Sequence, residues 1–107
     1  MIRMPRRVKV GAHVYKILVK PASVMWDNGE ALHGWCRFHS LEIWIVRGLP
    51  LSKRQEILLH EVLHAATHPT LNCCKRINDE EFVTAISPVL KEALQDNLQF
   101  VMFLTQS

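Results

Sequence analysis

The stretch that decides the fold is LSKRQEILLHEVLHAATHP, which occupies residues 51–69. Ser52 with Gln55 three residues later is typical of a capping box at a helix start. His68 before Pro69 marks the end, because the residue before a proline avoids helical geometry. Between these signals the sequence predicts a helix that is apolar nearly all round and lies close to the core. Its apolar surface consists of Ile57, Leu58, Leu59, Val62, Leu63, Ala65 and Ala66.

Inside this helix the segment His60-Glu61-Val62-Leu63-His64 has the pattern His-Glu-x-x-His. Residues four apart project from one helix face about one turn apart, so His60 and His64 can reach the same metal ion. Two imidazoles leave room for a third protein ligand and a water, as in a catalytic zinc site. Glu61 lies beside them, where a carboxylate can accept a proton from that water. The pattern indicates a zinc-dependent hydrolase, and the alternative is a helix with two hydrogen-bonded core histidines.

No histidine is well placed as the third ligand. Metzincin-type enzymes have a histidine six positions after the second motif histidine, where this chain has Thr70. His68 lies a further turn beyond His64, and three ligands stacked over two turns cannot converge on one ion. We therefore expect His68 to be a helix-end residue.

A carboxylate is the better candidate. Glu80 and Glu81 lie some 16 residues beyond His64, at the start of a second helical region, and either could complete a His-His-Glu set. Asn78 followed by Glu81 predicts a capping box, which would leave Glu80 freer to point at the motif helix. Acids also favour any helix start, because they compensate the helix dipole. Both glutamates stay open as ligands.

The first half of the chain predicts strands. Residues 7–20 are rich in β-branched residues and contain Gly-Ala at 11–12, which predicts two short strands or one strand broken by a turn. Residues 21–34 predict a loop, and residues 35–46 predict a hairpin. In that hairpin one face consists of Leu41, Ile43 and Ile45.

The sequence of the second half of the chain predicts a further helical region. Residues 79–104 have apolar side chains at helical spacing, and Pro88 should kink or divide this region. Its last apolar residues, which we expect to dock on the core, are Phe100, Val101, Phe103 and Leu104. The predicted fold class is α+β: a short antiparallel sheet, the motif helix, and a long C-terminal helical region kinked by proline.

Composition is that of an ordinary globular protein, with 49% hydrophobic and 21% charged residues, so we expect one domain over residues 1–107. No apolar run could span a bilayer, and residues 1–7 lack the apolar core of a signal peptide. We therefore expect a cytoplasmic protein without a membrane partner. Cys36, Cys73 and Cys74 lack the paired spacing of a structural zinc site and are expected to be small thiols.

The formal net charge is +3, and the surplus lies at the amino end. The cations there are Arg3, Arg6, Arg7, Lys9, Lys16 and Lys20. Such a stretch could contact nucleic acid phosphates. Because few aromatic residues are interleaved with it, the sequence favours the solvated face of a strand over nucleic-acid binding.

The motif, together with Ile57-Leu58-Leu59 before it and residues 79–83 and 86–90 after it, resembles the small metallopeptidase-like proteins of phages and bacteria. These are related to the minimal gluzincins of the ImmA/IrrE type. The resemblance covers roughly residues 34–100, and only the His-Glu-x-x-His core is highly specific. It implies a short antiparallel sheet against the active-site helix, Zn²⁺ held by two histidines and one downstream glutamate, and Glu61 as general base.

The expected function is a zinc metallopeptidase acting on a protein or peptide, in which Glu61 passes its proton to the leaving amine. His33, His39 or Tyr15 could help to stabilise the oxyanion, and a strand such as residues 41–46 could pair with an extended substrate. Two alternatives remain. One is a catalytically silent zinc-binding regulatory or interaction module of a phage or mobile element. The other is a nucleic-acid-associated zinc protein, including a SprT-like one.

Overall fold

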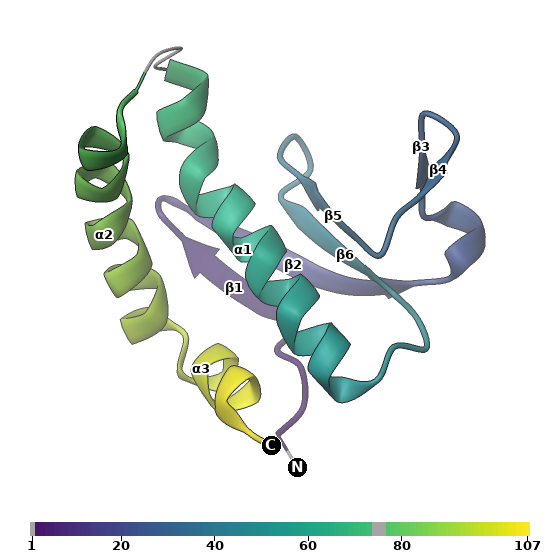
Figure 1. The fold of residues 1–107 in the computed structure, drawn as a ribbon. Coiled ribbons are helices and arrows are strands. Elements are labelled where there is room, and N and C mark those ends of the chain that lie inside the picture. Colours follow the sequence, from purple (N-terminus) through teal and green to yellow (C-terminus); the bar gives the residue numbers. More distant parts are fainter. Residues whose placement is uncertain (1, 74–76) are drawn as a thin grey trace.

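The computed structural model describes residues 2–73 and 77–107, apart from the side chains of residues 72, 73 and 79. The elements are β1 (Arg7–Val10), β2 (His13–Lys20), a 3-10 turn (Ala22–Val24), β3 (Trp26–Asp27), β4 (Glu30–Ala31), β5 (Gly34–Arg37), β6 (Glu42–Val46), α1 (Leu51–Cys73), α2 (Asp79–Asp96) and α3 (Leu98–Thr105). Helix α1 crosses one face of the sheet, and α2 and α3 flank it on the same side (Figure 1). The architecture is therefore mixed α and β, with the helices gathered on one face.

The main sheet has four strands in the order β1-β2-β6-β5, and β3 and β4 form a separate two-stranded hairpin. The pairs β1–β2 and β5–β6 are antiparallel hairpins. The hairpin predicted for residues 35–46 is confirmed, and of the two alternatives for residues 7–20 the structure has two strands. The expectation of an antiparallel sheet is wrong at the centre, where β2 and β6 are parallel. The reason is the connection through residues 21–41, which is long enough to return the chain to the starting end of β2. Part of this connection, predicted as loop, forms the β3–β4 hairpin.

The core lies between the sheet and the helices. Alternate strand residues point into it, including Ile43 and Ile45, which are both fully buried, as their spacing predicted. Helix α1 contributes its apolar face, and α3 contributes Phe100 and Phe103. The prediction that the C-terminal apolar tail docks on the core is confirmed by the burial of these two rings.

The start of α1 differs from the prediction. The helix begins at Leu51, so Ser52 lies inside it and does not cap it. The Gln55 side chain instead donates hydrogen bonds of 2.9 Å to the carbonyl oxygens of Phe103 and Gln106. The predicted capping box is therefore wrong, because Gln55 is used to hold the end of α3 against α1.

The end of α1 also differs, because the helix continues past Pro69 to Cys73. A proline inside a helix removes the hydrogen bond to the carbonyl four residues earlier, here that of Ala65. Ala65 and Ala66 are buried in the core, and this packing outweighs the local preference to stop. Pro88 likewise does not divide the second helical region, which breaks at Asn97 instead.

The start of α2 agrees with the prediction. Asn78 accepts a hydrogen bond from the Glu81 amide at 2.8 Å, and Glu81 accepts one from the Asn78 amide at 3.3 Å. This is the predicted capping box. None of the described helices is both long enough and apolar enough to cross a bilayer.

Candidate metal centre

His60 and His64 lie one turn apart on α1 and face each other. Their Nε2 atoms are 3.1 Å apart, and their ring planes are inclined by 72°. Two imidazoles bound to one tetrahedral zinc at about 2.1 Å would have nitrogens roughly 3.4 Å apart, so the pair already has nearly the spacing of two ligands. Both residues are exposed, so the alternative of two buried core histidines is wrong. The donor chemistry of this pair fits zinc.

Glu61 is buried beside the histidine pair, with 7% of its surface exposed. Burial raises the pKa of its carboxyl group above the usual range. The positive charge that His60 and His64 can carry and a hydrogen bond from the Cys36 backbone amide act in the opposite direction. Burial is the largest of these effects, so the net change is a raised pKa.

The close approach of α1 to β5 depends on Gly34, which the sequence analysis did not single out. A Cβ atom at this position would lie 2.5 Å from Ile57 Cγ2 and 2.9 Å from Glu61 Oε2. Any side chain would therefore push the helix away from the strand. An isolated glycine within a strand is the sequence signal that could have identified this contact.

We expect Gly34→Ala to destabilise the protein by about 1–3 kcal/mol, the usual cost of overpacking. Ile57 is β-branched, so its Cγ2 methyl cannot easily rotate away. Urea unfolding measures the effect. In the double variant Gly34→Ala/Ile57→Ala, much of the Gly34→Ala penalty should disappear; an equal penalty in both backgrounds would contradict the clash.

The strand next to the motif helix has a free edge. The Val46 amide donates to the His33 carbonyl at 2.8 Å, so alternation along the antiparallel pair directs the backbone groups of Gly34 and Cys36 to the open side of β5. The prediction that residues 41–46 could pair with a substrate is wrong, because β6 is paired with β2 and β5 on its two sides.

The histidine pair and Glu61 line a cavity of about 280 Å³. The other residues that line it are Asp27, Leu32, Gly34, Trp35, Cys36 and Phe38. Phe38 also lines a larger cavity of about 780 Å³, so this ring separates the two spaces. His68 stacks on Phe38 with ring centroids 3.7 Å apart, which gives it a structural partner instead of a metal.

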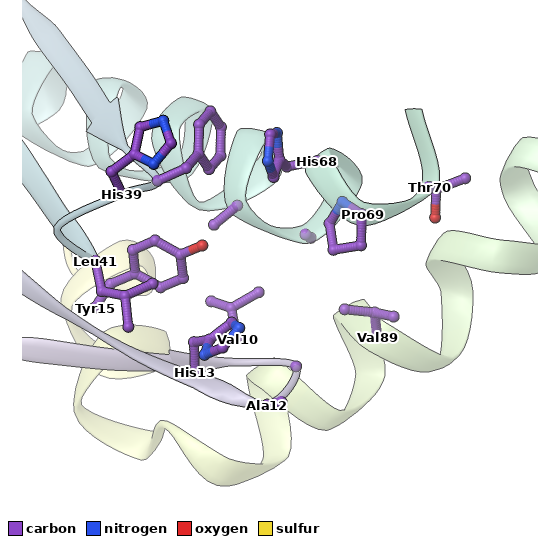
Figure 2. A pocket seen from close by; sticks show the side chains of 14 residues that line it. Val10, Ala12, His13, Tyr15, His39, Leu41, His68, Pro69, Thr70 and Val89 are labelled. Carbon is purple, nitrogen blue, oxygen red and sulfur yellow. The ribbon is translucent and has the colours of Figure 1, made fainter. Parts of the chain in front are cut away.

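The larger cavity lies between the β1–β2 turn and the C-terminal half of α1 (Figure 2). The Tyr15 hydroxyl points toward α1, and His13, His39 and His68 lie around the space. Of the predicted oxyanion donors, Tyr15 and His39 line this cavity, and His33 lines a third one. None of the three lines the cavity of the histidine pair.

Within the described residues, the histidine pair has no third ligand beside it. Among the described side chains, no group of three His, Cys, Asp or Glu residues is gathered for a metal ion. Glu80 is exposed, and Glu81 caps α2. The reason is the length of α1, which runs nine residues past His64, a rise of about 14 Å, so α2 begins beyond its far end. Besides Glu61, the cavity of the pair is lined by the carboxylate residue Asp27.

Cys36 is a buried free thiol on β5. Burial and the nearby Glu61 raise its pKa to about 12. The side chains of Cys73 and Cys74 lie outside the described part of the structure.

Comparisons with known proteins give no match among family models, curated proteins or solved structures.

Proposed function

We propose that this chain is a zinc-dependent metallopeptidase, related to the minimal gluzincins that its motif resembles. The observation that carries the proposal is the convergence of His60 Nε2 and His64 Nε2 beside the buried Glu61. The two histidines and one carboxylate would hold the metal. When bound, zinc would polarise a peptide carbonyl and make a water more acidic.

Glu61 would be the general base that transfers a proton from the attacking water to the leaving amine. Its carboxylate takes a proton from the attacking water and later releases it to the leaving amine. A pKa raised by burial suits both steps, because the group then binds a proton readily without holding it too tightly. The Cys36 amide keeps the carboxylate pointed at the cavity.

The substrate would be an extended peptide bound along β5. The open edge can pair with a peptide backbone through Gly34 and the Cys36 carbonyl, because the Cys36 amide is hydrogen-bonded to Glu61. The cavity beyond Phe38 can take a bulky apolar side chain. The walls of that cavity come mainly from apolar residues, among them Val10, Leu41, Ala65, Ala66 and Val89.

A cleavage assay tests the proposal. Zinc-loaded protein incubated with denatured casein and with a library of extended peptides should release defined fragments, detected by mass spectrometry. A zinc chelator should stop the release, and added zinc should restore it. The proposal fails if zinc-loaded protein cleaves none of these substrates.

We further propose that the third ligand is Glu80 or Glu81. For either to reach the pair, α1 would end at Pro69, where the helix already lacks one backbone hydrogen bond. Losing the correct glutamate should weaken zinc binding at least about 100-fold, since even partners that only orient a ligand are worth 10–100-fold. Zinc affinity of Glu80→Gln, Glu81→Gln and Asp27→Asn, measured by competition with a chromophoric chelator, identifies the ligand. A loss confined to Asp27→Asn would show that β3 supplies it instead.

One observation favours a second function, a catalytically silent zinc-binding regulatory or interaction module. Only two ligands are gathered among the described side chains. Such a module would bind zinc in the competition measurement but cleave nothing in the assay.

A further inference from the structure

The sheet has a second face, which the helices do not cover. Strand residues that alternate with the buried ones point away from the core, and all three helices lie on the other side of the sheet (Figure 1). The residues of this outer face are Arg7, Lys9, Val14, Lys16, Leu18, Lys20, Trp35, Arg37, Glu42, Trp44 and Val46, of which Val14 is exposed and Val46 is buried. It therefore holds five cations, two tryptophans and one carboxylate.

The strand register places these side chains in two rows. One row crosses all four strands through Arg7, Lys16, Glu42 and Arg37, and the next row contains Leu18, Trp44 and Trp35. A charged row thus runs beside an aromatic row. The β2–β6 pairing creates this arrangement by bringing the basic amino end next to the tryptophan hairpin.

The charge of the outer face is largely uncompensated. Its carboxylate, Glu42, accepts a hydrogen bond from Trp44 Nε1 at 2.9 Å. Within the described part of the chain, none of the five cations forms an ion pair with a carboxylate. Since the whole chain has a formal net charge of only +3, its positive charge is concentrated on this face.

Two of the cations, Arg37 and Lys20, make cation–π contacts with the aromatic row. The Arg37 guanidinium lies 4.3 Å from the Trp44 ring and 5.0 Å from the Trp35 ring, and Lys20 Nζ lies 4.6 Å from Trp44. The two indoles meet edge to face, with centroids 5.7 Å apart. Indole and guanidinium planes are the surfaces on which unpaired bases stack.

A small cavity extends the basic surface beyond the sheet. It has a volume of about 280 Å³, and Arg3, Arg6, Arg7, Met4 and Gln99 line it. Arg7 belongs to both the cavity and the charged row. Three guanidinium groups around one space suit a phosphate, which arginine can bind through two parallel hydrogen bonds.

We propose that the outer face binds single-stranded nucleic acid. The arginines and lysines neutralise its phosphates. Bases stack on the Arg37 guanidinium and on the parts of the Trp35 and Trp44 rings that the cations leave exposed. In a duplex the bases stack on one another, so none is free to stack on the aromatic row. An anionic membrane would require apolar side chains that project beyond the charges, whereas both tryptophans are half-buried beneath cations. The proposal does not rest on peptidase activity. Trp35 also lines the cavity of the histidine pair, whereas Trp44 and the five cations do not.

The test is fluorescence anisotropy with a labelled oligothymidylate of about 20 nucleotides, titrated with the full chain at several salt concentrations. The matched variants are Lys9→Gln/Lys16→Gln on the outer face and Lys53→Gln/Lys91→Gln on exposed helix positions. Lys9→Gln/Lys16→Gln should weaken binding at least about ten-fold at low salt. It should also reduce the slope of log affinity against log salt by about 1.4, because two phosphate contacts are lost. The helix pair should change affinity less than about two-fold.

Trp35→Leu and Trp44→Leu test the stacking. Each should reduce the preference for the oligothymidylate over a duplex of equal length, with circular dichroism confirming the fold. Equal weakening by the two lysine pairs would overturn the proposal, because binding would then follow net charge alone. Binding to phosphatidylserine vesicles without binding to the oligonucleotide would overturn it as well.

Discussion

Glu61→Gln is expected to lower peptide hydrolysis by zinc-loaded protein about 10³-fold, the usual contribution of a positioned general base, while leaving zinc content unchanged. Glutamine can still accept the hydrogen bond from the Cys36 amide, so the geometry should survive. It cannot accept a proton from the attacking water. Turnover of a fluorogenic peptide and zinc content measured by mass spectrometry give the two readouts.

Glu56→Gln is the matched control, because Glu56 is an exposed carboxylate on the same helix. It should retain full turnover. If Glu61→Gln hydrolyses peptide as fast as the unmodified protein, Glu61 is not the base. If neither protein hydrolyses peptide but both bind zinc, the silent zinc-binding module is the correct function.

The same substitution should change the stability of the zinc-free protein in a pH-dependent way. Burial raises the pKa of Glu61 in the folded state, so its contribution to stability is present below its ordinary pKa of 4.5 and is lost as the pH rises through the folded value. At neutral pH the zinc-free Glu61→Gln variant should therefore melt a few degrees higher than the unmodified protein. The difference should shrink as the pH falls from the folded-state pKa toward 4.5, and it should be absent below 4.5. A variant that melts lower at neutral pH would show that the buried carboxylate is not a source of strain.

His60→Ala and His64→Ala are each expected to remove most of the stabilisation by zinc. At a free zinc concentration 1,000 times the dissociation constant, binding stabilises the folded state by about 4 kcal/mol. For a domain of this size that raises the melting temperature by roughly 15 °C or more. Either variant leaves one imidazole, which should reduce the shift to a few degrees. Differential scanning calorimetry with and without zinc measures it.

His68→Ala is the control for the histidine pair. His68 lies a further turn along α1 and stacks on Phe38, so its loss should leave the zinc-induced shift intact. A shift that is lost in His68→Ala, but kept in His60→Ala, would place the metal in the larger cavity instead.

Local sequence patterns predicted the elements that depend on neighbouring residues. The capping box of Asn78 and Glu81 forms within one helical turn, and the two hairpins join strands close in sequence. Where local preference competed with packing, packing prevailed. Pro69 lies inside α1, since Ala65 and Ala66 are buried against the core on the preceding turn.

In the candidate site, too, local patterns predicted some features, and contacts between distant segments decided the others. Helical periodicity placed His60 and His64 on one face, and the structure brings their Nε2 atoms together. The supporting contacts come from β5, which lies about 25 residues earlier in the chain than Glu61 and touches it through Gly34 and the Cys36 amide. Such contacts depend on how the strand docks on the helix, and no pattern within either segment reports it.

The sequence by itself determined the helix that carries the two histidines and Glu61, the hairpin of residues 35–46, and the apolar faces that form the core. These follow from hydrogen bonds and side-chain spacing over a few residues. Only the tertiary structure decided that β2 and β6 pair in parallel, that β5 has the free edge, and that the basic amino end lies beside Trp35 and Trp44. These outcomes depend on contacts between distant segments, where the area buried must outweigh the entropy of closing the connecting loop.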